Sequence, residues 1–301
     1  GAVFTYYLKD GLKTVQEERR EGEECRSRRS ADTPYPGWDA LRAEEVEDAP
    51  AIVLTVRDAA GEVIRHIEGP LTPGFHRVAW DLRYPRSEPW APPVEGPVYI
   101  DFPGPLAAPG RYSIQLGKRV NGQYSDLGTP QSFEVVPMRQ RGLPGLPPEE
   151  VVAFSLRLDD VKRQVSGAEA AVTDFLAETA AIKETLLRSQ APAALRDRAR
   201  TIELELLDLQ QKLAGNQARS FYGDEGPVSI KRRLEVAIMG TFRSTYGPTP
   251  THQRMIEIAE SEFSGVKDRI QRLSEAELPA LRRELDAADV PWTPGRGVPA
   301  E

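Results

Sequence analysis

Cysteine, histidine and long apolar runs are scarce in this sequence of 301 residues. Cys25 is the only cysteine, so no disulfide can form within the chain, and both a cytosolic and an extracellular location stay open on this count. No window approaches the roughly 18 consecutive apolar residues that a transmembrane helix requires, so we predict no membrane span. Residues 1–8 lack an initiator Met, a basic segment and a signal-peptide core, and they have the pattern of a strand. We therefore expect a fragment of a longer protein.

An excess of positive charge is also missing. The chain has 39 Lys and Arg residues against 46 Asp and Glu residues, which gives a net charge of -7. Nucleic-acid binding needs clustered, uncompensated basic residues, and here nearly every basic run is interleaved with acidic ones. We therefore exclude nucleic acid as a partner. The 40% of apolar and 28% of charged residues are typical of a globular protein, and the length suits two domains.

Sequence motifs that carry chemistry are absent too. The three histidines, His66, His76 and His252, are far apart and match no metal-ligand spacing. No nucleophile elbow, Walker-type loop or dinucleotide-binding glycine motif occurs. We therefore predict no catalytic residue, no cofactor, no metal and a non-catalytic role. A hydrolase that uses paired carboxylates is the third and least favoured hypothesis, because a glycoside hydrolase needs only two carboxylates about 5–10 Å apart, and Asp and Glu are abundant.

The segment 51–136 has the two-residue period that is typical of half-buried strands. It contains about seven short strand patterns separated by turns, as in an immunoglobulin domain, and Asn121-Gly122 indicates a type I′ hairpin turn. A Pro-rich connection holds at most a short strand at 98–102. We predict an Ig-like or fibronectin-like β-sandwich over residues 1–137, with a charged helical insertion at about 9–47.

The pattern changes after residue 137. Residues 138–148 contain two Gly-Leu-Pro units and are predicted to be a linker. Residues 149–290 are predicted to form an antiparallel bundle of three or four long helices, with a tail at 291–301 and a kink or division at Pro279. A homo-oligomer formed through the helices is the alternative. The longest apolar seam steps by alternating fours and threes through Phe154, Leu158, Val161, Val165, Ala168, Val172, Phe175, Thr179, Ile182 and Leu186.

Three aromatic residues are candidate contact points for a ligand or a partner. Tyr35 and Trp38 follow the charged segment, and Trp90 lies in the Pro-rich connection. Aromatic side chains stack on sugar rings, although more often they fill cores. These residues carry the second hypothesis, a carbohydrate-binding accessory module of a glycoside hydrolase.

Five segments spread over nearly the whole chain carry a family resemblance. They are Phe4–Asp10 (FTYYLKD), Leu54–Asp58 (LTVRD), Gly74–Tyr84 (GFHRVAWDLRY), Ala108–Leu116 (APGRYSIQL) and Pro291–Arg296 (PWTPGR). Together they resemble the C-terminal region of bacterial BNR-repeat, sortilin-like β-propeller proteins, which are often labelled glycosyl hydrolases. The middle part also resembles the Ig-like domain of flagellar hook-capping proteins.

The resemblance implies an extracellular or periplasmic protein in which any catalytic or ligand site lies on an upstream propeller. The chain contains no Asp-box of the S-x-D-x-G-x-x-W type, so no functional residue is carried over. The first hypothesis is therefore a structural or interaction module, the C-terminal accessory part of a larger secreted protein. Its expected partners are the upstream propeller domain, another protein or a glycan.

Overall fold

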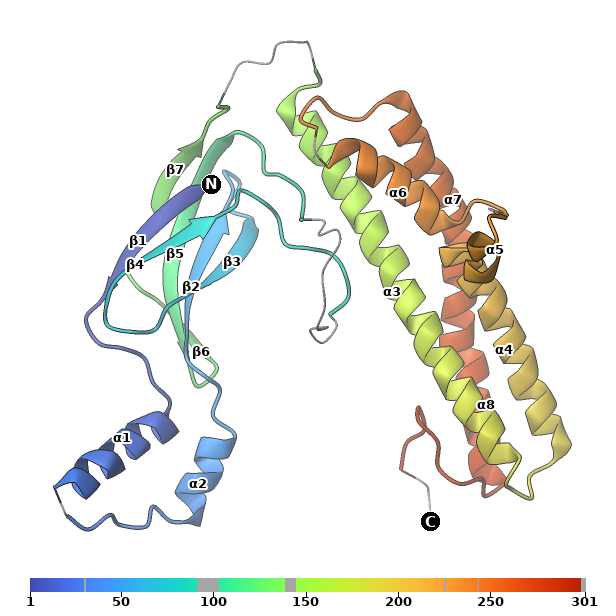
Figure 1. The fold of residues 1–301 in the computed structure, drawn as a ribbon, viewed down its shortest axis with the longest axis horizontal. Coiled ribbons are helices and arrows are strands. Elements are labelled where there is room, and N and C mark those ends of the chain that lie inside the picture. The colour runs from blue at the N-terminus through green and yellow to red at the C-terminus, as the bar shows by residue number, and fades with distance from the viewer. Residues whose placement is uncertain (30, 91–102, 139–144, 225, 243, 299–301) are drawn as a thin grey trace. The chain divides into compact units, whose positions relative to one another are not determined.

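The computed structural model describes residues 1–298, with the exception of residues 30, 91–102, 139–144, 225 and 243. For residues 217 and 220 it describes the backbone only. It is a mixed α and β protein with two antiparallel sheets and a set of helices (Figure 1). Two compact units divide the chain: the first is Gly1–Pro85 with Leu106–Gly142, and the second is Arg86–Pro105 with Leu143–Glu301. None of the described helices combines the length and apolarity that a membrane crossing demands.

The first unit contains both sheets. One sheet has two strands, β1 (Ala2–Leu8) and β4 (Gly74–Trp80), which pair antiparallel along their full length. The other has the order β3-β2-β5-β6, and β7 also pairs with β5. The bounds of its strands are β2 Ala51–Arg57, β3 Val63–Gly69, β5 Gly110–Val120, β6 Gln123–Asp126 and β7 Gln131–Val135.

A single hydrophobic core is shared by the two sheets. Ile52, Leu54 and Val56 are buried in it, as the two-residue period of this strand predicts. Trp80 at the end of β4 is also buried, and its ring lies edge-on to Tyr112 of β5 at a centroid distance of 5.4 Å. Burial of a large apolar side chain contributes about 1.5–3 kcal/mol. The inner face of the small sheet is therefore held against the large one by side-chain packing.

The hairpin between β5 and β6 confirms the predicted turn. Asn121 and Gly122 have φ values of 50° and 71°. A type I′ turn requires positive φ at both central residues, and Asn and Gly are the residues that tolerate it best. The predicted strand at 98–102 and most of the predicted linker, at 139–144, lie outside the described residues.

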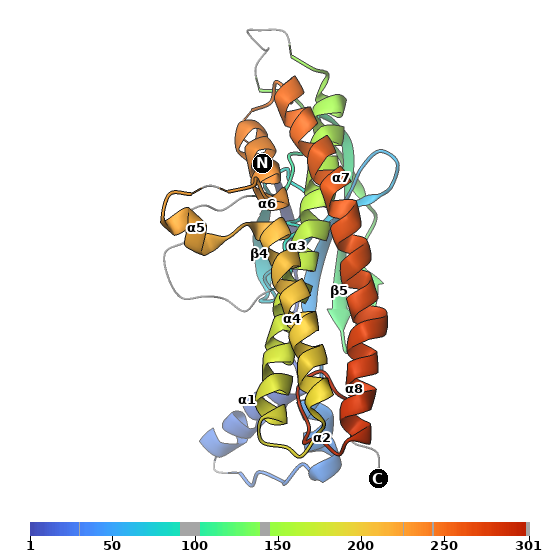
Figure 2. The same ribbon diagram turned by 90° about the vertical axis from the view of Figure 1, so that its right-hand side faces the viewer.

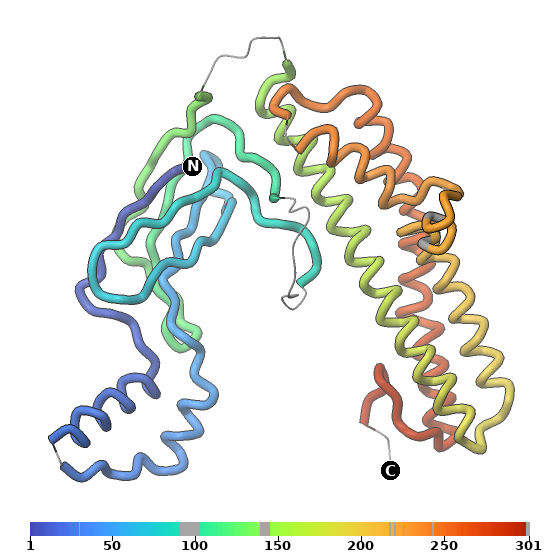
Figure 3. The backbone as a smooth tube through the Cα atoms, in the orientation of Figure 1, coloured from blue at the N-terminus to red at the C-terminus, as the bar shows by residue number. Residues whose placement is uncertain are grey.

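Two helices, α1 (Val15–Arg28) and α2 (Trp38–Glu45), lie between β1 and β2 in the chain. Figure 3 traces the chain out of β1, through both helices and back into β2. No residue of α1 is buried, because its sequence is charged on all sides. Its first turn is capped by Thr14, whose hydroxyl accepts from the Glu17 amide. Local capping and ion pairs, not an apolar stripe, therefore hold this helix.

The second unit is built from helices. α3 packs against α4, α6 and α7, and Figure 2 shows α3, α4 and α7 running alongside one another. Every position of the predicted α3 seam is buried or partly buried in the core of this unit. The helices are α3 Pro148–Leu186, α4 Ala193–Ala214, α5 Gln217–Phe221, α6 Ile230–Thr241, α7 Pro250–Arg272, the π-helix η1 Leu273–Glu277 and α8 Leu278–Ala287.

The predicted division of the last helix at Pro279 is confirmed. The α-helical hydrogen bonds of α7 stop at Arg272, the π-helix follows, and Pro279 lies in the first turn of α8. Proline has no amide hydrogen to donate and its ring crowds the preceding turn, so a local widening of the helix accommodates it.

The segment 291–298 folds back onto the end of the second unit. The buried guanidinium of Arg296 donates from Nε to Asp286 Oδ1 at 2.9 Å, and from NH1 to the carbonyls of Val290 and Pro291 at 3.0 and 2.9 Å. Gly295 has φ +86°, and a Cβ there would meet the buried Glu178 carboxylate. The predicted tail is thus an ordered part of the helical unit as far as residue 298.

Replacing Arg296 with Ala should lower the free energy of unfolding of the helical unit by about 2–3 kcal/mol, because buried carbonyls lose their donor. Denaturant unfolding followed by circular dichroism at 222 nm measures the change. The control is Arg283→Ala on α8, an exposed arginine, which should shift stability by less than about 0.5 kcal/mol. Equal effects of the two substitutions would show that the tail contributes nothing.

Candidate functional site

The predicted aromatic contact points do not form one group. Tyr35 and Trp38 are both exposed and lie together, with ring centroids 5.9 Å apart in an edge-to-face arrangement. Trp38 is the first residue of α2, and Gly37 precedes it with φ +88°, which turns the chain into the helix. Trp90 is exposed as well, but it belongs to the second unit. The structure brings together two of the three predicted residues.

The outward face of the β1–β4 sheet is a larger apolar surface that sequence analysis did not identify. We call the face formed by Val3, Thr5, Tyr7, Phe75, Arg77 and Ala79 the outer β1–β4 face. Val3 is 63% exposed, Tyr7 57% and Phe75 80%. The rings of Tyr7 and Phe75, which are cross-strand partners, have centroids 4.9 Å apart. Exposed aromatic pairs on a sheet face are typical of binding surfaces.

The two-residue period gave one signal that this face exists. In β1 the residues Phe4, Tyr6 and Leu8 point into the core, so a strand with one wet face should have polar residues between them. The intervening residues of β1 are instead Val3, Thr5 and Tyr7, and none is charged. A strand whose two faces are both uncharged is expected to be covered on both sides.

The free edge of β1 is the second feature of this site. The structure pairs β1 with β4 alone, which leaves the backbone groups on its other side without a strand partner among the described residues. Such edges are usually protected by charged residues, prolines or bulges. β1 has none of these, whereas β3, β4, β6 and β7 each contain at least one charged residue.

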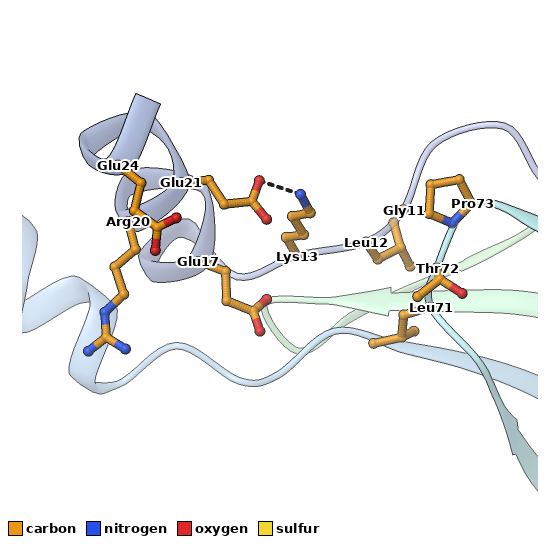
Figure 4. A pocket seen from close by; sticks show the side chains of 10 residues that line it. All are labelled: Gly11, Leu12, Lys13, Glu17, Arg20, Glu21, Glu24, Leu71, Thr72 and Pro73. Carbon is orange, nitrogen blue, oxygen red and sulfur yellow. Dashed lines mark hydrogen bonds and ion pairs between the residues drawn. The ribbon is translucent and has the colours of Figure 1, made fainter. Parts of the chain in front are cut away.

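A shallow cleft of about 430 Å³ lies at the base of the helical insertion (Figure 4). One wall is the first part of α1 with Glu17 and Glu21, and the other is the turn at Leu71 and Pro73. Lys13 forms an ion pair with Glu21 inside it. The charged residues that line the cleft are of both signs.

The position of α1 is fixed by an ion pair with α2. Arg19 donates from Nε and NH2 to the two carboxylate oxygens of Glu44 at 2.6 and 2.8 Å, and the Glu44 side chain is almost completely buried. The Arg19 guanidinium holds the pKa of Glu44 below its ordinary value. Glu47 accepts from the amide of Val15 at the start of α1, where a negative charge is favourable.

Two carboxylates in the second unit have pKa values shifted in opposite directions. Burial raises the pKa of Asp159 on α3, although Ser87 donates a hydrogen bond to it at 2.7 Å. Burial also acts to raise the pKa of Glu88, but the Lys162 ammonium and other favourable contacts outweigh it and lower the pKa overall. These contacts attach the segment after Pro85 to α3.

The histidines make local structural contacts. His66 lies 3.1 Å from Thr55 Oγ1, and His76 lies 2.6 Å from the carbonyl of Thr72. His252 accepts from the Thr249 amide at the start of α7. In the part of the chain that the structure describes, no group of three or more His, Cys, Asp or Glu residues is arranged to hold a metal ion.

Comparison of the chain with protein-family models, with curated proteins and with solved structures found no match. The resemblance to BNR-repeat, sortilin-like proteins stays a prediction.

Acidification should release α1 from α2. A carboxylate whose pKa is lowered in the folded state stabilises that state above its ordinary pKa, near 4.5, and the contribution is lost as the pH falls below it. A nitroxide attached to the exposed Cys25 on α1 should therefore become more mobile as the pH falls through the lowered folded-state pKa of Glu44, which lies below 4.5, as measured by electron paramagnetic resonance.

Glu44→Gln should give the mobile spectrum already at pH 7, and trypsin should cleave its α1 severalfold faster. Glu45→Gln, which removes a neighbouring exposed carboxylate and changes the net charge equally, is the matched control and should behave like the unsubstituted protein. A rigid label in Glu44→Gln at pH 7 would refute the role of the ion pair.

Proposed function

We propose that this chain is a non-catalytic structural and interaction module. The observation that carries the proposal is the outer β1–β4 face, where exposed Val3, Tyr7 and Phe75 share one surface. We propose an Ig-like or fibronectin-like sandwich with a helical insertion, followed by an antiparallel bundle of three or four long helices. On the strength of the family resemblance, we also propose that it is the C-terminal accessory part of a larger extracellular or periplasmic protein with an upstream β-propeller.

The architecture proposed for the first unit is supported by its packing. Phe4 of β1 lies edge-on to Phe133 of β7 with centroids 5.1 Å apart, and Trp80 contacts the same ring. Two antiparallel sheets that share one core in this way are the basis of sandwich folds.

Solvation of the outer β1–β4 face supports a binding role. Complete burial of a large apolar side chain such as Phe75 contributes about 1.5–3 kcal/mol, and burial of Phe75, Tyr7 and Val3 together would offset part of the roughly 4–15 kcal/mol that association costs. Scattered single apolar residues need no explanation, but Tyr7 and Phe75 are an exposed aromatic pair on the same sheet face as the exposed Val3. A protein surface is the partner that would cover it.

Photo-crosslinking tests the interaction surface. We expect p-benzoylphenylalanine at position 75 to form a covalent protein adduct in the native host on irradiation, because the ring would be buried in an interface. The same residue at position 222 is the control, since Tyr222 is an aromatic with a similar exposure of 83% in the other unit. No adduct at position 75, or equal adducts at both, would overturn the proposal. So would turnover of glycoside or peptide substrates that survives repurification of the chain.

Carbohydrate binding is the second candidate function, favoured by the exposed edge-to-face pair of Tyr35 and Trp38. If this pair binds carbohydrate, the protein should migrate more slowly in affinity electrophoresis gels that contain a polysaccharide to which it binds. Trp38→Ala should abolish this retardation. Trp292→Ala, which removes another exposed tryptophan, should leave it unchanged. Migration that is identical in all gels would exclude this function.

A further inference from the structure

We propose that the β1 strands of two copies of this chain pair antiparallel across a two-fold axis at Thr5. The pairing extends the two-stranded sheet into a continuous four-stranded one, in the order β4, β1, β1 of the second copy and β4 of the second copy. This inference rests on the proposed interaction function and names its partner as a second copy of the chain.

The edge of β1 has the properties of a pairing site. It is seven residues long, has no charged residue and no proline, and its register with β4 contains no bulge. Long, uncharged, regular edges are those that pair with another chain. A two-stranded sheet is also below the usual size, since sheets most often have about 4–6 strands. The pairing of two such sheets gives the edge of β1 a partner and also raises the number of strands in the sheet to four.

The β1 sequence is complementary to itself in this register. Because β1 runs from Ala2 to Leu8, an axis at Thr5 pairs every residue of the strand and leaves no overhang. On the outer β1–β4 face, Val3 lies opposite Tyr7 of the second copy and the two Thr5 residues face each other. On the core side, Phe4 lies opposite Tyr6. Aromatic with β-branched, Thr with Thr and aromatic with aromatic are favourable cross-strand pairs.

Charge does not oppose this arrangement. The charged residue nearest the axis on the outer β1–β4 face is Arg77, which pairs with Thr5 from β4. The two Arg77 residues of the dimer are therefore three strand spacings apart, about 14 Å, which exceeds the Debye length of about 8 Å at physiological ionic strength. The antiparallel arrangement also puts the insertions that follow Leu8 at opposite ends of the shared sheet. The helical insertions do not meet.

The helices are less suited than β1 to bind a second copy of the chain. The seam positions of α3 and α4, including Val172, Ile182 and Leu206, are buried within one chain. A helix-mediated oligomer would need these residues to leave their own core. The edge of β1 has no strand partner among the described residues and needs no rearrangement to pair.

Cysteine crosslinking tests the axis. In a Cys25→Ser background, Thr5→Cys should form a disulfide-linked dimer under mild oxidation at micromolar concentration. Residues directly opposite in an antiparallel pair have Cα atoms about 4.5–5.5 Å apart, and disulfides need about 4.4–6.8 Å. Ser132→Cys on β7, an edge strand that contains Glu134, is the control and should form no disulfide-linked dimer.

The register is tested by a second pair of variants. Val3→Cys and Tyr7→Cys should each form no disulfide-linked dimer alone and should crosslink when mixed, since each lies opposite the other and about 13 Å from its own copy along the strand. In sedimentation velocity, the unsubstituted chain should show a dimer at rising concentration. Thr5→Lys, at an exposed position, should remain monomeric with an unchanged circular dichroism spectrum, because it opposes two ammonium groups at the axis.

Failure of this inference can be distinguished from failure of the proposed function. If Thr5→Cys does not crosslink and the chain sediments as a monomer, the self-pairing is overturned. If the adduct at position 75 then has the mass of a different protein, the interaction function stands and the second copy is the wrong partner. If neither crosslink forms, both are overturned.

Discussion

The packing of Trp80 between the two sheets is the interaction on which the first unit depends. Its indole contacts Tyr112 and Phe133 of the large sheet, and its Nε1 donates to the Arg83 carbonyl at 3.0 Å. An indole in this position satisfies its one donor while it buries its whole apolar surface. Trp80 fixes the position of β4, and β4 in turn fixes the position of β1, because the two strands are paired along their full length. The inner face of the small sheet is therefore buried in the core. Its outer face is exposed, and the edge of β1 has no strand partner among the described residues.

The helical unit depends on charge in addition to its apolar seams. Glu178 is buried on α3 and accepts from both Nε and NH2 of Arg282 on α8, at 2.7 and 2.6 Å. A buried carboxylate without a cation would be strongly unfavourable, so this pair fixes which part of α8 lies beside α3. Gly295 then covers the carboxylate with backbone because it has no side chain. The C-terminal segment is held in this place by the hydrogen bonds of Arg296 to Asp286 and to the carbonyls of Val290 and Pro291.

Local features of this fold could be predicted from the sequence, and features that depend on distant parts of the chain could not. The seam from Leu158 to Leu186, the Asn121-Gly122 turn and the break at Pro279 each follow from spacing or from the conformational limits of one or two residues. The pairing of β1 with β4 joins segments about 70 residues apart, and no local pattern specifies it. Likewise, Tyr35 and Trp38 are close in sequence and meet in space, whereas Trp90 joins a different unit through contacts such as that of Ser87 with Asp159.

The sequence signal for the outer β1–β4 face is ambiguous, for a physical reason. A strand with apolar residues on both faces looks the same whether it is central, as β2 is, or lies at an edge, as β1 does. In β2 the two apolar faces are explained by burial, since Ile52, Leu54, Thr55 and Val56 are all inaccessible. In β1 only Tyr6 and Leu8 are buried, and Val3 and Tyr7 are not. Apolar residues on both faces are therefore explained by burial in β2, whereas the described residues do not bury the outer face of β1.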